Sequence, residues 1–111
     1  MIVRTQKSRT ALHIAASLGY CDIVETLLKF GACLGVTEKR QQTALHLAAE
    51  LGYAEVAEVL LSFGADLSVP EKGGRKALYI AARGSYTAIV DMLIKVERNQ
   101  IVKVRYLPTY L

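Results

Sequence analysis

The sequence is poor in the residues that most often carry chemistry. Its 111 residues include no tryptophan, only two cysteines and only two histidines. Cys21 and Cys33 form neither a metal-ligand spacing nor a disulfide framework, which favours a reducing, intracellular compartment. A zinc site needs three or four convergent ligands, and His13 and His46 have no cysteine or carboxylate at a suitable spacing. We therefore expect no metal and no cofactor.

Catalytic motifs are missing as well. The sequence has no glycine-rich phosphate loop, and no serine, cysteine or threonine lies in a local nucleophile motif. Glu25, Glu58 and Asp91 recur at a fixed spacing, but such a row is typical of a solvated helix face. We expect a protein that is not an enzyme and has no small-molecule substrate.

Long apolar runs and a strong net charge are also absent. The chain is 52% apolar, yet no run approaches the roughly 18 residues of a membrane span. The first nine residues lack the apolar segment of a signal peptide. Residues 1–100 carry 12 basic and 10 acidic side chains, so nucleic acid is the least favoured partner. We expect a cytoplasmic protein, with the nucleus as the alternative location.

What the sequence does have is a repeat with a period of 33 residues. The stretch TALHLAA at residues 43–49 matches TALHIAA at residues 10–16 and KALYIAA at residues 76–82. A Gly-Tyr pair and a Phe-Gly-Ala triplet recur at the same period in the first two copies. A fixed period of this length indicates a stacked repeat array rather than an ordinary globule.

The pattern predicts two helices in each repeat. In the first copy, Thr10 can cap one helix and Gly19 can end it. A second helix is expected from about Cys21 to Phe30, because apolar residues recur there at helical spacing. The polar residues 38–42 are predicted to form an exposed turn. Each histidine is interpreted as bonding the threonine three residues before it and tethering the neighbouring turn.

Together these motifs resemble the ankyrin repeat family over about nine-tenths of the chain. The resemblance implies an all-α ankyrin-repeat solenoid of three stacked helix-turn-helix units with short hairpin fingers. We place the repeats at about 5–37, 38–70 and 71–103 within a single domain 1–111, and 104–111 is a C-terminal extension. The family's finger glycine is replaced by Ser8 and Gln41 in the first two repeats and kept only at Gly74.

The third repeat departs from the pattern. Lys76 and Tyr79 replace the threonine and histidine, and Ser85 takes the usual glycine position. Glu97-Arg98-Asn99 replaces Gly-Ala-Asp, so the last helix either runs on past Val96 or ends at Asn99. We expect residues 100–111 to form an extended segment covering the last repeat, with a disordered tail and a truncation scar as alternatives.

Repeat one shows no polar substitution on its outer face, although terminal repeats of an array normally need one. The chain therefore resembles an excerpt of a longer array, or a protein that covers this end with a partner or with its own copy.

In the ankyrin family, partners dock on the finger tips and the concave inner-helix face. Carried over position by position, the partner-binding candidates are Lys7, Arg9, Ser17, Leu18, Lys39, Arg40, Gln42, Glu50, Leu51, Lys72, Arg75, Lys76 and Arg83. The resemblance implies a protein-binding module whose basic fingers attract an acidic partner segment. Solubility is the alternative role for the fingers, and a structural section of a longer scaffold, stacking on neighbouring repeats or on itself, is the alternative function.

Overall fold

The structure is a computed structural model that describes residues 9–106, with side chains for residues 9–99. This part of the chain contains helices and turns and no strand. The helices are α1 (Ala11–Leu18), α2 (Cys21–Lys29), α3 (Ala44–Leu51), α4 (Ala54–Ser62), α5 (Ala77–Arg83) and α6 (Thr87–Tyr106). The predicted all-α solenoid is confirmed.

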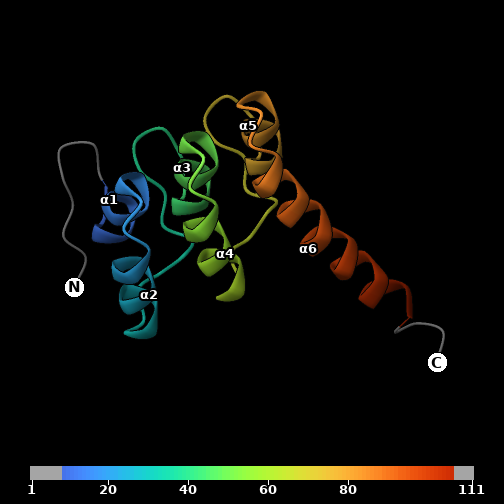
Figure 1. The fold of residues 1–111 in the computed structure, drawn as a ribbon, viewed down its shortest axis with the longest axis horizontal. Coiled ribbons are helices and arrows are strands. Elements are labelled where there is room, and N and C mark those ends of the chain that lie inside the picture. The colour runs from blue at the N-terminus through green and yellow to red at the C-terminus, as the bar shows by residue number, and fades with distance from the viewer. Residues whose placement is uncertain (1–8, 107–111) are drawn as a thin grey trace.

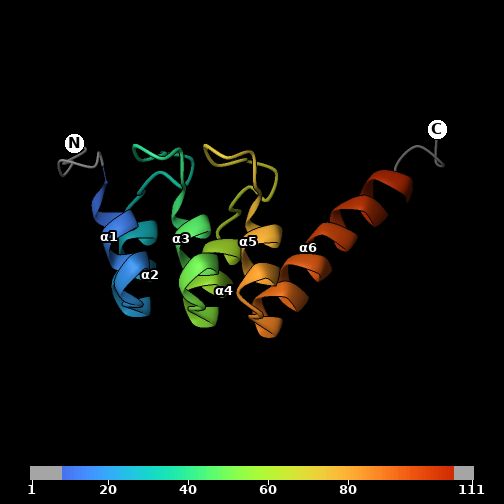
Figure 2. The ribbon, with the colours of Figure 1, turned by 90° about the horizontal axis from the view of Figure 1, so that it is seen from above.

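The helices form two layers. Figure 1 shows α1, α3 and α5 side by side in one row, with α2, α4 and the start of α6 in a second row. Each helix packs on its counterpart in the next repeat and on the other helix of its own repeat. The loops between repeats project from one side of the stack, as Figure 2 shows from above. The core is therefore drawn out along the axis of an elongated molecule of 49 × 31 × 25 Å.

Local signals in the sequence set the ends of the inner helices. Thr10 Oγ1 accepts a hydrogen bond from the His13 backbone N–H at 3.3 Å, and Thr43 does the same for His46 at 3.4 Å. In return, each imidazole accepts the backbone N–H of its threonine, which completes a capping box. The predicted threonine caps are thus confirmed, whereas Lys76 at the start of α5 makes no side-chain cap.

The core repeats with the sequence. Small residues such as Ala16, Ala49 and Ala81 are fully buried, so neighbouring inner helices can approach closely. Between the outer helices, Leu60 and Leu93 occupy the same position in successive repeats and are also closed off from solvent. Burying these residues requires neighbouring repeats, because one helix pair alone would leave them in water.

Repeats two and three each place a tyrosine ring against a glycine of the preceding repeat. The Tyr53 ring lies over Gly19, where an added Cβ would be 3.1 Å from Cε1. The Tyr86 ring lies even closer to Gly52, where the same distance would be 2.4 Å. Both glycines are left-handed, with φ of +76° and +79°. Glycine is thus required twice, by its backbone conformation and by the ring against it.

The expectation of an extended segment after residue 99 is wrong within the described residues. Helix α6 continues past Val96 and Asn99 to Tyr106 in one piece. The first of the two expected alternatives for its end is therefore confirmed. No Gly-Ala-Asp stop is present, and extending an existing helix costs far less than starting a new element. The remaining residues 107–111 lie outside the described part of the chain.

Candidate protein-binding surface

Fingers two and three, defined here as residues 38–42 and 71–75, have the same backbone. In finger two, the Gln41 N–H donates to the Glu38 carbonyl at 2.8 Å; in finger three, Gly74 donates to Glu71 at 2.8 Å. Gln41 adopts a φ of +61° at the position where Gly74 has +82°. The missing glycine has therefore not changed the turn. Finger one, with Ser8, lies outside the described residues.

A buried carboxylate organises each finger. The Glu38 carboxylate is 1% exposed, and its Oε1 accepts the backbone N–H groups of Arg40 at 2.6 Å and Gln42 at 3.1 Å. In finger three, Glu71 Oε1 accepts the Arg75 backbone N–H at 3.0 Å, and Oε2 lies 3.2 Å from Arg75 Nη2. The Arg75 hydrogen bonds lower the pKa of Glu71 to about 2.

Sequence reasoning missed these two carboxylates. It treated residues 38–42 as exposed throughout, which is wrong at Glu38 and at Gln42, both of them buried. The available signal was their spacing, since Glu38 and Glu71 are 33 residues apart and each precedes a lysine. A polar run gives no further indication of which of its members closes the turn.

The histidines of α1 and α3 connect their helices to the loop that carries the next finger. His13 Nδ1 accepts the Thr10 backbone N–H at 3.1 Å, while Nε2 lies 3.0 Å from the Gln42 carbonyl. His46 makes the same bond to its own threonine, but its Nε2 lies 2.8 Å from the carbonyl of Val69, two residues before finger three. Because Nδ1 is an acceptor, Nε2 carries the proton and donates it to the carbonyl. The interpretation of the Thr-His pairs as structural tethers is confirmed.

These tethers make the fold sensitive to acid. Burial lowers the pKa of His13 and His46 below the ordinary value of 6.5. The unfolded chain therefore takes up protons at a higher pH than the folded chain, and acid favours unfolding.

We expect the melting temperature to be constant above about pH 7 and to fall as the pH drops through the unfolded value of about 6.5. Hydrogen bonds from Arg75 lower the pKa of Glu71. The stability that Glu71 contributes is therefore lost only below about pH 4.5. The pH range of the histidine effect therefore does not overlap that of the Glu71 effect. A thermal melt series with no fall between about pH 7 and pH 5.5 would contradict the histidine assignment.

Fingers two and three are also joined directly. The Lys72 backbone N–H donates to the Arg40 carbonyl at 3.0 Å, so a hydrogen bond links the two tips. Lys39, Arg40 and Lys72 are exposed on these tips, while the carboxylates of Glu38 and Glu71 are turned inward. The arrangement therefore separates charge, with cations facing the solvent and their acidic neighbours inside.

The structure distributes the other sequence-predicted residues over several environments. Gln42 is 2% exposed, with Nε2 3.2 Å from Glu50 Oε2, so it is not available to a partner. Arg9 lies 3.7 Å from Glu38 and Arg75 is paired with Glu71, so both belong to the finger framework. Those that are exposed are Leu18, Glu50, Leu51, Lys76 and Arg83. Ser17 is half-buried, and Lys7 lies outside the described residues.

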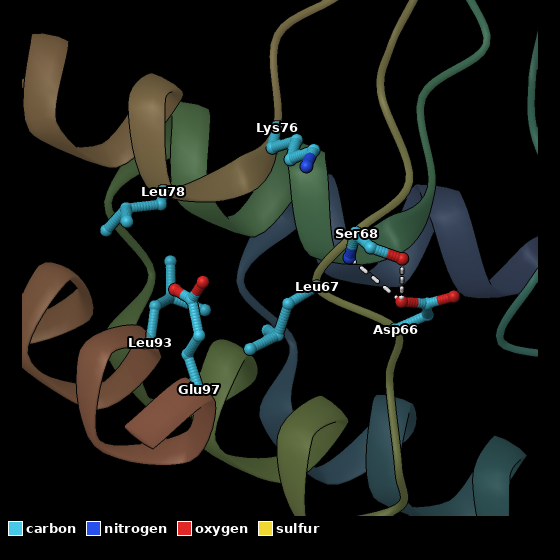
Figure 3. A pocket seen from close by; sticks show the side chains of 7 residues that line it. All are labelled: Asp66, Leu67, Ser68, Lys76, Leu78, Leu93 and Glu97. Atoms are coloured by element: carbon cyan, nitrogen blue, oxygen red, sulfur yellow. Dashed lines mark hydrogen bonds between the residues drawn. The ribbon is translucent and has the colours of Figure 1, made fainter. Parts of the chain in front are cut away.

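A small cavity of about 220 Å³ lies at the far end of the stack, between the loop at residues 66–68, the start of α5 and α6 (Figure 3). Ser68 donates to Asp66 Oδ1 through its backbone N–H at 2.8 Å and its hydroxyl at 2.6 Å, which lowers the pKa of Asp66. Leucines contribute much of the lining, and Lys76 and Glu97 add one charge of each sign. Asp66 and Ser68 thus serve a local turn, because both hydrogen bonds close between residues two apart.

Neither a metal cluster nor a membrane span is found in the part of the chain that the structure describes. No group of three or more His, Cys, Asp or Glu side chains in residues 9–99 is placed to hold a metal ion. The helices there lack the combination of length and apolar character needed to cross a bilayer.

A family model described as ankyrin repeats, in three copies, matches residues 12–105. Comparison with curated proteins gives no match. Proteins of the matched family are typically non-enzymatic and in general serve as protein–protein interaction modules. Since the match spans most of the sequence and agrees with three stacked helix pairs, the chain belongs to the ankyrin repeat family.

Proposed function

We propose that the chain is a non-enzymatic module that binds a protein partner through fingers two and three and the inner-helix face. The observation that carries this proposal is the separation of charge in the fingers. Lys39, Arg40 and Lys72 face the solvent, whereas Glu38 and Glu71 are buried beneath them. This leaves a positive edge that would attract an acidic segment of the partner.

The fingers are held in place before any partner arrives. His13 holds the Gln42 carbonyl in finger two, His46 holds the Val69 carbonyl just before finger three, and a bond between Lys72 and Arg40 joins the two tips. A surface that is already ordered loses less conformational entropy on binding, so more of the contact energy appears as affinity. Rigid fingers therefore suit recognition of a defined partner shape.

The inner helices also offer exposed apolar side chains. Leu18 and Leu51 lie at the ends of α1 and α3, 33 residues apart, and are 52% and 43% exposed. Glu50 and Arg83 flank them as exposed charges. We propose that the leucines anchor the partner while the fingers steer it, in a protein that acts as an intracellular adaptor or scaffold with repeats at about 5–37, 38–70 and 71–103.

Charge reversal on the fingers tests this function. We expect the triple variant Lys39→Glu, Arg40→Glu and Lys72→Glu to weaken partner binding by about tenfold or more, because each lost contact contributes of the order of 1 kcal/mol. Partners would be captured from a cell extract, and the affinity of each would then be measured by calorimetry. Arg75 is left unchanged, because reversing it would place two acids against each other in finger three.

A control carries a similar change of charge elsewhere. Lys95 and Arg98 are exposed on α6, so reversing both makes the chain more acidic without touching the fingers. Lys29 is left unchanged, because its reversal would place an acid against Glu25. We expect this control to bind like the original chain, and both charge-reversal variants to keep its melting temperature. Equal binding by the finger variant would remove the fingers from the interface.

A second candidate function is self-association or stacking on a neighbouring repeat through the open end of repeat one. The observation that favours it is Ile23, which is 49% exposed, although its counterparts Val56 and Ile89 are each 1% exposed.

A further inference from the structure

An apolar stripe runs along α2, from Tyr20 to Phe30, with its central Leu27 partly packed against the core. Ile23 and Leu27 lie on one side of α2, and Tyr20 and Phe30 lie at its N-cap and C-cap. The four residues are spaced by three, four and three. At the equivalent positions of repeat two, the Tyr53 ring lies over Gly19 of the preceding repeat, and Val56 and Leu60 are buried. The stripe on α2 is therefore a continuation of the interface that already joins the repeats.

These positions are more exposed in repeat one than in the repeats that follow it. Ile23 is 49% exposed, against 1% for Val56, its counterpart in the next repeat. Phe30 is 87% exposed, whereas Phe63 at the equivalent position is 40% exposed. On the inner layer, Ile14 is 37% exposed, while the equivalent Leu47 is 3% exposed. Two layers of helices thus present apolar side chains to solvent on the same end of the molecule.

The stripe is complementary to itself. Tyr20 and Phe30 lie five residues on either side of position 25, and Ile23 and Leu27 lie two residues on either side. In an antiparallel pair of α2 helices related by a two-fold axis, aromatic residues would face aromatic residues and aliphatic residues would face aliphatic ones. With about 100° per residue, Glu25 itself points away from the stripe. Its carboxylate pairs with Lys29 at 3.3 Å.

The other end of the molecule does not offer a matching surface for head-to-tail stacking. Helices α2 and α4 stop at Lys29 and Ser62, where the chain turns towards the next finger. Helix α6 instead continues to Tyr106 and slopes away along the stack, as Figure 1 shows. A following repeat would have to share this space with α6. A closed two-fold pair avoids the conflict, and it also leaves no open end to grow further.

We propose that two copies of this chain form a dimer through the α2 stripe, with the two α2 helices antiparallel about a two-fold axis. This dimer deepens the second candidate function, self-association, and uses no residue of the fingers. Each copy would cover the apolar end of the other and leave both finger surfaces accessible. A partner protein could then bind the fingers of both copies at once.

Analytical ultracentrifugation of the full chain over a range of concentrations tests the dimer. We expect a mass that rises with concentration towards twice the 12.2 kDa of one chain. Ile23→Lys and Phe30→Lys should each raise the dimer dissociation constant by at least about tenfold, because a lysine would be desolvated in the apolar interface. Both positions are exposed in the single chain, so helical circular dichroism and the melt of the monomer should be preserved.

Ile94→Lys is the matched control. Ile94 is an apolar residue of α6 that is 38% exposed, on the side that would face a following repeat. The two-fold dimer should survive this change, whereas a head-to-tail assembly would lose it together with Ile23→Lys. The triple finger variant should also dimerise normally, which separates this test from that of partner binding.

Three results would overturn the proposal. They are a monomer at every concentration, loss of association in Ile94→Lys, and a dimer that persists in both Ile23→Lys and Phe30→Lys.

Discussion

Replacing His46 by alanine is expected to destabilise the protein by about 3 kcal/mol, because it opens a cavity and leaves buried backbone groups without partners. The His46 side chain is 2% exposed, and it bonds both Thr43 and the Val69 carbonyl. A loss of this size is a large part of the roughly 5–15 kcal/mol that stabilises a typical domain. Urea or thermal unfolding followed by circular dichroism would measure it.

Tyr79→Ala provides the comparison within the same chain. Tyr79 occupies the equivalent position in repeat three and is 55% exposed. We expect its replacement to cost less than about 1 kcal/mol, because little buried area is lost. Similar losses for the two variants would mean that the tether to the next finger contributes little.

Replacing Gly52 by alanine should be the second large effect. Two penalties combine, since an alanine at a φ of +79° costs about 1–2 kcal/mol and displacing the Tyr86 ring costs about 1–3 kcal/mol more. The ring cannot stay where it is, because an added Cβ would lie 2.4 Å from its Cε1. We therefore expect a loss of about 2–5 kcal/mol in equilibrium unfolding.

Gly64→Ala separates these two penalties. Gly64 has a φ of +92° and no heavy atom within 4 Å of an added Cβ, so it carries the backbone cost alone. The difference between the two variants reports the contact between repeats. In the background of Gly52→Ala, Tyr86→Ala should then cost less than it does alone. If Gly52→Ala proves no worse than Gly64→Ala, the ring does not hold the repeats together.

The parts of the fold that could be predicted from the sequence are those set over a few residues and then repeated. The capping of α1 depends on Thr10 and His13, three residues apart, so the sequence alone was sufficient. The burial of Leu60 follows from the same stripe in every repeat. Stacking could be inferred because no single helix pair can bury its own apolar side.

Other features depend on contacts that the sequence does not display. The burial of Glu38 arises because its carboxylate accepts two backbone N–H groups of its own turn. Gln42 was expected on the surface, yet its carbonyl is held by His13 from the preceding repeat. The course of α6 could not be fixed either, since a short alternation of apolar and basic residues fits both a strand and a helix. In each case the local pattern permitted two outcomes.

The tethers give the array a direction. Each histidine binds a carbonyl that lies later in the chain, so repeats one and two each hold the loop that begins the next repeat. Repeat three has Lys76 and Tyr79 in place of the threonine and histidine. It is also the repeat whose outer helix, α6, runs on to Tyr106 instead of ending in a turn. An engineer who lengthens the protein could therefore duplicate residues 38–70 in the middle without further change. Growth beyond residue 83 would first require threonine and histidine to be restored at positions 76 and 79.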